Sequence, residues 1–198
     1  MSFRIEEKIV LTASDMARLQ ADLQARGMVP LYPARLIRSV YFDTSGLQMF
    51  SDSEEGVLPR KKVRLRRYPE QADAGAVLET KISSVEGRFK TALPVAPETE
   101  RRLLRQGHFD RDYGTLQAMV AVSYRRAYYS LDGLRITFDR DIAYARPDGQ
   151  TARREAWTVC ELKAPAEAPL DALHHILPVP RRRFSKFCNG VSAVIARA

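Results

Sequence analysis

Residues 62–66 read Lys-Val-Arg-Leu-Arg, and this alternation of charged and apolar side chains decides the fold. Successive side chains of a β-strand point to opposite faces, so Lys62, Arg64 and Arg66 share one face while Val63 and Leu65 share the other. An apolar face of this kind packs into a core. The stretch therefore predicts a half-buried strand whose second face is densely charged.

The same two-residue step of charged side chains returns in four other segments. These are Arg4, Glu6 and Lys8; Glu79 and Lys81; Arg135 and Asp139 with Thr137 between them; and Glu161 and Lys163. For one strand alone, such a face is most simply the solvated outside of a barrel. Repetition on five strands favours charged faces that converge on a shared interior site. That interior must be hydrated and hold anions, because unpaired buried charges each cost several kcal/mol.

Composition supports one globular domain over residues 1–198 with an anionic partner. The 198 residues are 45% hydrophobic, and 32 Lys and Arg oppose 24 Asp and Glu, a net charge of +8. Nucleic acid, an anionic membrane surface and a phosphate polymer would each suit that charge. No run approaches the ~20 apolar residues of a membrane span, and the N-terminus carries charges, so we expect a soluble, cytoplasmic protein.

Hydrophobic periodicity predicts a mainly antiparallel α+β chain. The expected strands are 3–11, 36–44, 60–68, 75–83, 87–95, 119–130, 134–143 and 156–164. Helices are expected at 14–26, at 97–106, near 169–177 and from about residue 185 to the C-terminus; the first two each end at a glycine. No linker or repeat divides the chain.

The charged segments resemble, in order, the motifs of the triphosphate tunnel metalloenzymes, and within them the VTC domain of polyphosphate polymerases. The motifs are RIEEK (Arg4, Glu6, Lys8), SVYFDT (residues 39–44), KVRLR (Lys62, Arg64, Arg66), LETK (Glu79, Lys81), YRR (Tyr124, Arg126), RITFD (Arg135, Asp139), ELK (Glu161, Lys163) and FSKF (residues 184–187). The resemblance spans nearly the whole chain. It implies eight strands closed into a β-tunnel with flanking helices.

Two positions favour the VTC domain over the CYTH-type tunnel hydrolases, which typically open with two glutamates. Arg4 occupies the first of those positions, and an arginine cannot ligate a cation. The FSKF segment is also similar to the VTC pattern.

The resemblance implies transfer of the terminal phosphoryl group of ATP to polyphosphate, with a Mn²⁺ or Mg²⁺ ion as cofactor. It implies catalytic roles for Lys8, Arg64, Arg66 and Lys186. Substrate-binding roles fall to Arg4, Lys62, Lys81, Lys90, Tyr124, Arg126, Arg135, Lys163 and Ser185. Glu161 is the expected metal ligand; Glu6 and Glu79 are either further metal ligands or carboxylates that pair with neighbouring cations, and Asp139 has the same two alternatives.

Three other functions remain open. A CYTH-type triphosphatase would use the same phosphate ligands but transfer the phosphoryl group to water. A polyphosphate or nucleotide sensor would bind without turnover. A nucleic-acid-binding module ranks last, because the chain has no aromatic-interleaved basic helix and no zinc pattern. The expected partners are ATP or another triphosphate and polyphosphate, with room for a separate membrane or regulatory protein.

Overall fold

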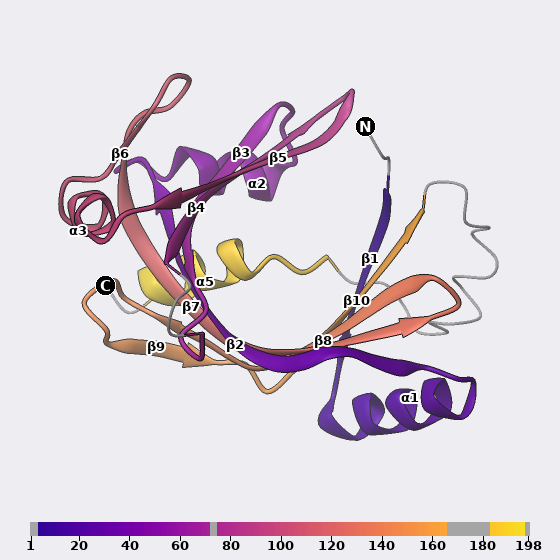
Figure 1. The fold of residues 1–198 in the computed structure, drawn as a ribbon. Coiled ribbons are helices and arrows are strands. Elements are labelled where there is room, and N and C mark those ends of the chain that lie inside the picture. Colours follow the sequence, from indigo (N-terminus) through magenta and orange to yellow (C-terminus); the bar gives the residue numbers. More distant parts are fainter. Residues whose placement is uncertain (1–3, 72–74, 166–182, 197–198) are drawn as a thin grey trace. The chain divides into compact units, whose positions relative to one another are not determined.

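The computed structural model describes residues 4–71, 75–165 and 183–196. Its elements are β1 (Arg4–Leu11), α1 (Ala13–Ala25), β2 (Val29–Asp43), α2 (Gln48–Glu55), β3 (Arg60–Arg67), β4 (Ala76–Ser84), β5 (Gly87–Val95), α3 (Pro97–Gln106), β6 (His108–Asp110), β7 (Gly114–Leu131), β8 (Leu134–Ala145), β9 (Thr151–Arg154), β10 (Thr158–Pro165) and α5 (Lys186–Ile195) (Figure 1). Among these helices, none is both long and apolar enough to cross a membrane.

The eight expected strands are the eight strands of one hydrogen-bonded path. Their order is β1-β10-β8-β7-β2-β3-β4-β5; the short β6 and β9 lie off this path and pair with β7 and β8. The registered pairs are antiparallel, so the α+β, mainly antiparallel fold class is confirmed.

Three expected helices are confirmed and the fourth, near 169–177, lies outside the described residues. Helix α2 and strands β6 and β9 were not predicted from the sequence, and β2 and β7 begin earlier than predicted. Residues 29–34 of β2 are all exposed and include Pro30 and Pro33, so this half of the strand lacks the alternating apolar pattern that marks a buried face.

The described chain packs as two compact units, each assembled from separate segments. Unit 1 takes residues 1–35, 124–142 and 155–184, and unit 2 takes residues 36–123, 143–154 and 185–198. Strands β2, β7 and β8 contribute to both units. The expected single domain over residues 1–198 stays a prediction.

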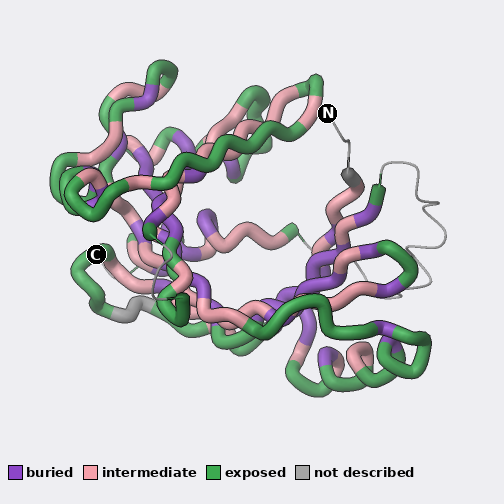
Figure 2. The backbone as a smooth tube through the Cα atoms, viewed as in Figure 1, coloured by how far each residue is buried: buried purple, intermediate pink, exposed green. Residues whose placement is uncertain are grey.

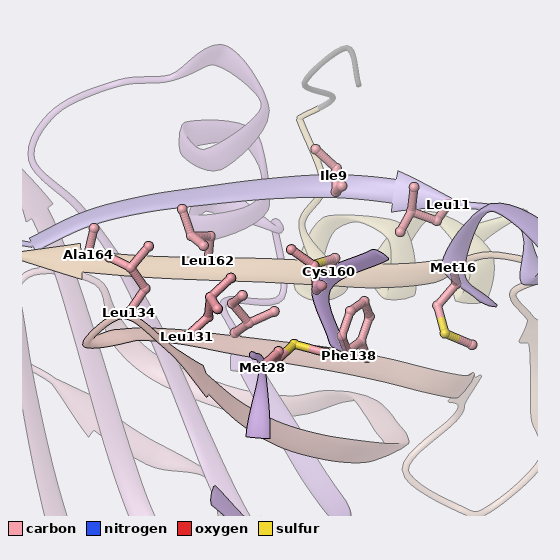
Figure 3. Close-up of a cluster of buried hydrophobic side chains, with 12 residues drawn as sticks. Ile9, Leu11, Met16, Met28, Leu131, Leu134, Phe138, Cys160, Leu162 and Ala164 are labelled. Carbon is pink, nitrogen blue, oxygen red and sulfur yellow. The ribbon is translucent and has the colours of Figure 1, made fainter. Parts of the chain in front are cut away.

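Unit 1 places α1 against the apolar face of its strands. Met16 and Leu23 of α1 pack with Ile9 of β1, Phe138 of β8 and Leu162 of β10 in one buried cluster, much of which is labelled in Figure 3. The helix begins after Thr12, whose Oγ1 accepts a hydrogen bond from the backbone N–H of Asp15 at 3.0 Å. This packing leaves the opposite, charged face of the strands to form a site.

Unit 2 buries the apolar face of β3, where Val63 and Leu65 lie, and exposes almost the whole length of β5 (Figure 2). Helix α5 approaches the strands closely at Gly190, where an added Cβ would lie 3.0 Å from side-chain atoms of Tyr144 and Val120. At its N-terminal end, the Phe187 ring lies 5.3 Å from the ring of Tyr41. Helix α5 thus packs against the strands at its N-terminal end and at its middle.

Candidate phosphate-binding site

In unit 1 the charged faces of β1 and β10 meet residue by residue. Lys8 is opposite Glu161, and Glu6 is opposite Lys163. Lys163 Nζ lies 3.0 Å from one oxygen of Glu161, and Lys8 Nζ lies 2.6 Å from Glu6 and 3.7 Å from Glu161. Glu161 is only 6% exposed. The charged face here is an ion network in which Glu161 is buried while Lys8 and Lys163 are partly exposed.

Arg126 of β7 extends this network toward β8. Its Nε and Nη2 donate to the two oxygens of Asp139 at 2.6 and 2.7 Å, and Nη2 lies 3.9 Å from Glu161. The guanidinium also lies over the Tyr124 ring, 5.4 Å from its centre. Because Asp139 is fully buried and both its oxygens accept from Arg126, its contacts favour a cation-pairing role over metal binding.

The electrostatics of unit 1 keep its carboxylates ionised. Burial would raise the pKa of Glu161, but Arg126, Lys8 and Lys163 outweigh burial and hold that pKa well below its usual range. Burial and the neighbouring Glu161 both act to raise the pKa of Glu6, and Lys8 and Lys163 still hold it below the ordinary value. The two glutamates are therefore close enough to repel each other, yet both stay charged.

In unit 2 Glu79 is the hub of a second network. Arg64 Nε donates to one oxygen of Glu79 at 2.6 Å, Arg66 Nη1 lies 3.7 Å from the same oxygen, and Lys90 Nζ lies 2.5 Å from the other. Burial would raise the pKa of Glu79, but Arg64 and Arg66 lower it to about 2. Both oxygens are engaged, so these contacts favour the pairing alternative for Glu79.

Three lysines form a row beside that hub. Lys62 of β3 is directly opposite Lys81 of β4, which is directly opposite Lys90 of β5. Like charges that face each other across strands destabilise a sheet. Five predicted cations lie on this face, Lys62, Arg64, Arg66, Lys81 and Lys90, and three of them, Arg64, Arg66 and Lys90, contact Glu79. Such an excess of positive charge suits a bound polyanion.

The start of α5 joins the lysine row. Lys62 Nζ donates to Ser185 Oγ at 3.0 Å and lies 5.6 Å from the centre of the Phe187 ring. Ser185 Oγ also accepts from the backbone N–H of Cys188 and so caps the helix. The predicted ligand Lys186 is the first residue of α5, where the helix N-terminus adds partial positive charge.

Tyr41 is a site residue that the sequence analysis did not select. Its hydroxyl accepts a hydrogen bond from Arg64 Nη1 at 2.8 Å, and the residue is 5% exposed. Burial would raise the pKa of Tyr41, yet Arg64 and Arg66 outweigh burial and lower it to about 7. The sequence did contain a signal for Tyr41, because Ser39 and Tyr41 are two residues apart and therefore share one face of β2. In register they are opposite Arg66 and Arg64 of β3, and the Ser39 hydroxyl accepts a hydrogen bond from Arg66 Nε at 3.2 Å.

Two predicted site residues remain, Arg135 and Arg4. Arg135 is opposite Lys163 in register. Arg4 begins β1, and its side chain is outside the described part of the chain. The predicted site residues whose side chains the structure describes thus divide into one group in unit 1 and one in unit 2.

The donor set of unit 1 fits a divalent cation that shares its coordination with a phosphate. Mg²⁺ typically uses one or two carboxylates together with water and substrate phosphate oxygens. Glu161 and Glu6 are two neighbouring carboxylates of this kind; each also contacts Lys8 and Lys163, so a bound cation would have to compete with these lysines. Within residues 4–71, 75–165 and 183–196, no three acidic, histidine or cysteine side chains gather closely enough to hold a metal ion by themselves.

Comparison with known proteins agrees with this fold. Two solved structures of candidate adenylate cyclases superpose over 93% of this chain: one from Bacillus halodurans (TM-score 0.65, 16% identity, 94% of that chain covered) and one from Vibrio parahaemolyticus (TM-score 0.57, 13% identity, 95% covered). A chain of the Schizosaccharomyces pombe Mediator head module matches with a TM-score of 0.52 at 10% identity, covering 88% of this chain and 94% of that one. No curated protein sequence matches.

The sequence itself matches the VTC domain over residues 3–195. That match covers the charged segments of both units and agrees with the motif order from RIEEK to FSKF. The triphosphate tunnel fold expected from the sequence is confirmed, and the chain belongs to the VTC domain family.

Proposed function

We propose that this protein is a polyphosphate polymerase that transfers the terminal phosphoryl group of ATP onto a growing polyphosphate chain. The observation that carries the proposal is the row of Lys62, Lys81 and Lys90, whose mutual repulsion a phosphate polymer would relieve. Arginine adds planar donors that match phosphate oxygens, and Arg64 and Arg66 stand beside the row.

The chemistry is an in-line phosphoryl transfer. An oxygen of the terminal phosphate of polyphosphate forms a bond to the γ-phosphorus of ATP while the bond from that phosphorus to the β–γ bridging oxygen breaks, and ADP leaves. Little covalent work is asked of the protein, so its cations act by positioning and by neutralising the phosphoryl oxygens. In unit 2 we assign this role to Arg64, Arg66 and Lys186.

In unit 1 we assign phosphate binding to Lys8, Arg126 and Lys163. Glu161 and Glu6 would hold a divalent cation, Mn²⁺ or Mg²⁺, which when bound neutralises phosphate charge. The network has a second function before substrate arrives, because the same carboxylates neutralise the lysines that later face phosphate.

The test is incubation of the purified protein with ATP and Mn²⁺, with products resolved by gel electrophoresis. We expect long polyphosphate from the wild type and none from Glu161→Ala or Lys186→Ala. Arg18→Ala in α1 and Arg101→Ala in α3 are matched controls, because both side chains are exposed and pair only with a nearby acid of their own helix in the described contacts. Both controls should keep full polymer yield.

Other products would replace the proposal. Release of orthophosphate without polymer would show a triphosphatase, which the adjacent carboxylates Glu6 and Glu161 could also serve. Binding of ATP or polyphosphate without either product, unchanged in Glu161→Ala, would show a sensor.

A further inference from the structure

Thr137 lies at the centre of the charged face of unit 1. It is between Arg135 and Asp139 on β8 and directly opposite Glu161 on β10. On its other side, β7 and β8 are joined by Asp132 and Gly133, which both have positive φ angles, as in a two-residue type I′ hairpin. Across this hairpin, Arg126 of β7 forms an ion pair with Asp139 of β8, with 2.6 Å between Nε and the carboxylate oxygen.

The Thr137 hydroxyl is buried without a hydrogen-bond partner. The residue is 2% exposed, and its Oγ1 makes no hydrogen bond to any atom of the described residues. A buried hydroxyl in that state is destabilising, whereas valine has the same shape and equal strand preference without the cost. Strand formation and packing therefore do not explain a threonine here.

The nearby acceptors already have cationic donors. Asp139 accepts from Arg126 at both oxygens, and the two oxygens of Glu161 lie 3.0 Å from Lys163 and 3.7 Å from Lys8. The Thr137 hydroxyl is therefore an additional hydrogen-bond donor at this position, and a bound ligand could supply its acceptor. Among three cations, that ligand is an anion, and a phosphate oxygen is a strong acceptor for a hydroxyl.

Access is compatible with this arrangement. The side chains of Lys8 and Lys163 are 33% and 23% exposed, so the long cations over this part of the face reach solvent and can turn toward an incoming anion. A phosphate that draws both lysines away from Glu161 would bring its oxygens next to residue 137, because Thr137 and Glu161 are cross-strand neighbours.

We propose that the Thr137 hydroxyl donates a hydrogen bond to a non-bridging oxygen of a phosphate group held by Lys8, Arg126 and Lys163. Thr137 is thus a phosphate-positioning residue of unit 1. The inference rests on the proposed function only in that both involve a phosphate ligand; it holds for polymerase, triphosphatase and sensor alike.

The test compares Thr137→Val and Thr137→Ser by calorimetric titration with inorganic tripolyphosphate. We expect about tenfold weaker binding by Thr137→Val, the value of one hydrogen bond to a charged group, and near wild-type binding by Thr137→Ser. The melting temperature of ligand-free Thr137→Val should equal or exceed that of the wild type. Thr158→Val is the matched control. Thr158 of β10 is buried like Thr137 but lies on the opposite face of the sheet, so the tripolyphosphate affinity of this variant should equal that of the wild type.

Three results would overturn the inference. Unchanged tripolyphosphate affinity in Thr137→Val would show that the Thr137 hydroxyl does not contact the phosphate. A lower melting temperature with unchanged affinity would show a purely structural hydroxyl. Weaker Mn²⁺ binding with unchanged tripolyphosphate affinity would make Thr137 a cation ligand. The proposed function is tested separately by polymer synthesis. A Thr137→Val protein with wild-type tripolyphosphate affinity and full polymer yield would contradict the role of Thr137 and leave the proposed polymerase activity intact.

Discussion

At the scale of single residues, Glu79 shows how a charged interior stays folded without its ligand. Its side chain is 4% exposed and joins cations from β3 and β5 across β4. A buried ion pair is weak evidence of net stabilisation, yet removal of one partner leaves uncompensated charge and is costly. Glu79 therefore acts as an internal counter-ion for Arg64, Arg66 and Lys90.

We expect Glu79→Gln to lower the free energy of unfolding by about 3 kcal/mol at neutral pH, because three cations lose their carboxylate. The neighbouring arginines lower the pKa of the Glu79 carboxyl to about 2 in the folded protein, from an ordinary value of 4.5. Its contribution is therefore complete above pH 4.5 and is lost as pH falls toward 2. Urea unfolding of both proteins over this range should show their difference shrink with falling pH.

The control for that experiment is Glu98→Gln, since Glu98 is 75% exposed and pairs with Arg101 on the surface of α3. It should change stability by no more than a few tenths of a kcal/mol. A Glu79→Gln protein as stable as the wild type at neutral pH would show that the carboxylate is not a counter-ion.

At the scale of elements, α2 depends on a residue that precedes it. Leu47, at the N-cap position, has a left-handed conformation and offers no side-chain cap. Asp43, at the end of β2, accepts instead from the backbone N–H groups of Thr44, Met49 and Phe50 at 2.8 to 2.9 Å. The aspartate of the SVYFDT segment thus joins a strand to a helix.

Asp43→Ala should destabilise the protein by about 2 kcal/mol or more, because buried N–H groups at the start of α2 lose their acceptor. Asp43→Asn keeps a carbonyl oxygen and should lose less. Thermal and urea unfolding measure both effects. Asp22→Ala, at an exposed position of α1, is the control, and equal losses at positions 22 and 43 would contradict a capping role for Asp43.

At the scale of the whole molecule, the positive side chains behind the net charge of +8 are unevenly distributed. Exposed arginines of α1 and α3 pair with acids of the same helix, whereas the row of Lys62, Lys81 and Lys90 concentrates positive charge in unit 2. Concentrated charge of one sign destabilises a folded protein and attracts a polyanion.

Tripolyphosphate should therefore raise the melting temperature; at a hundred times its dissociation constant the gain is about 2.7 kcal/mol. The gain should fall as NaCl is added, because salt screens these contacts. Lys81→Gln should gain less stability from tripolyphosphate than the wild type does. Arg101→Gln is the matched control, and an equal gain in both variants would exclude the lysine row as the binding surface.

Much of the fold follows from the sequence because its physical signal is local. Two-residue alternation predicted all eight strands of the main path, and glycine stops predicted the ends of α1 and α3. The first half of β2 gave no such signal, since its residues are exposed and include two prolines. Helix α2 was missed because its capping residue is four positions before Leu47, outside the usual N-terminal pattern.

The sequence by itself determined which strand faces are charged and which family the chain resembles, because side-chain direction in a strand depends only on position along it. Tertiary structure alone decided which charges neutralise each other. Strand register made Glu79 a counter-ion, brought Tyr41 to Arg64, and left the Thr137 hydroxyl without a partner among the described residues. These outcomes depend on contacts between distant segments, whose energies a local pattern does not encode.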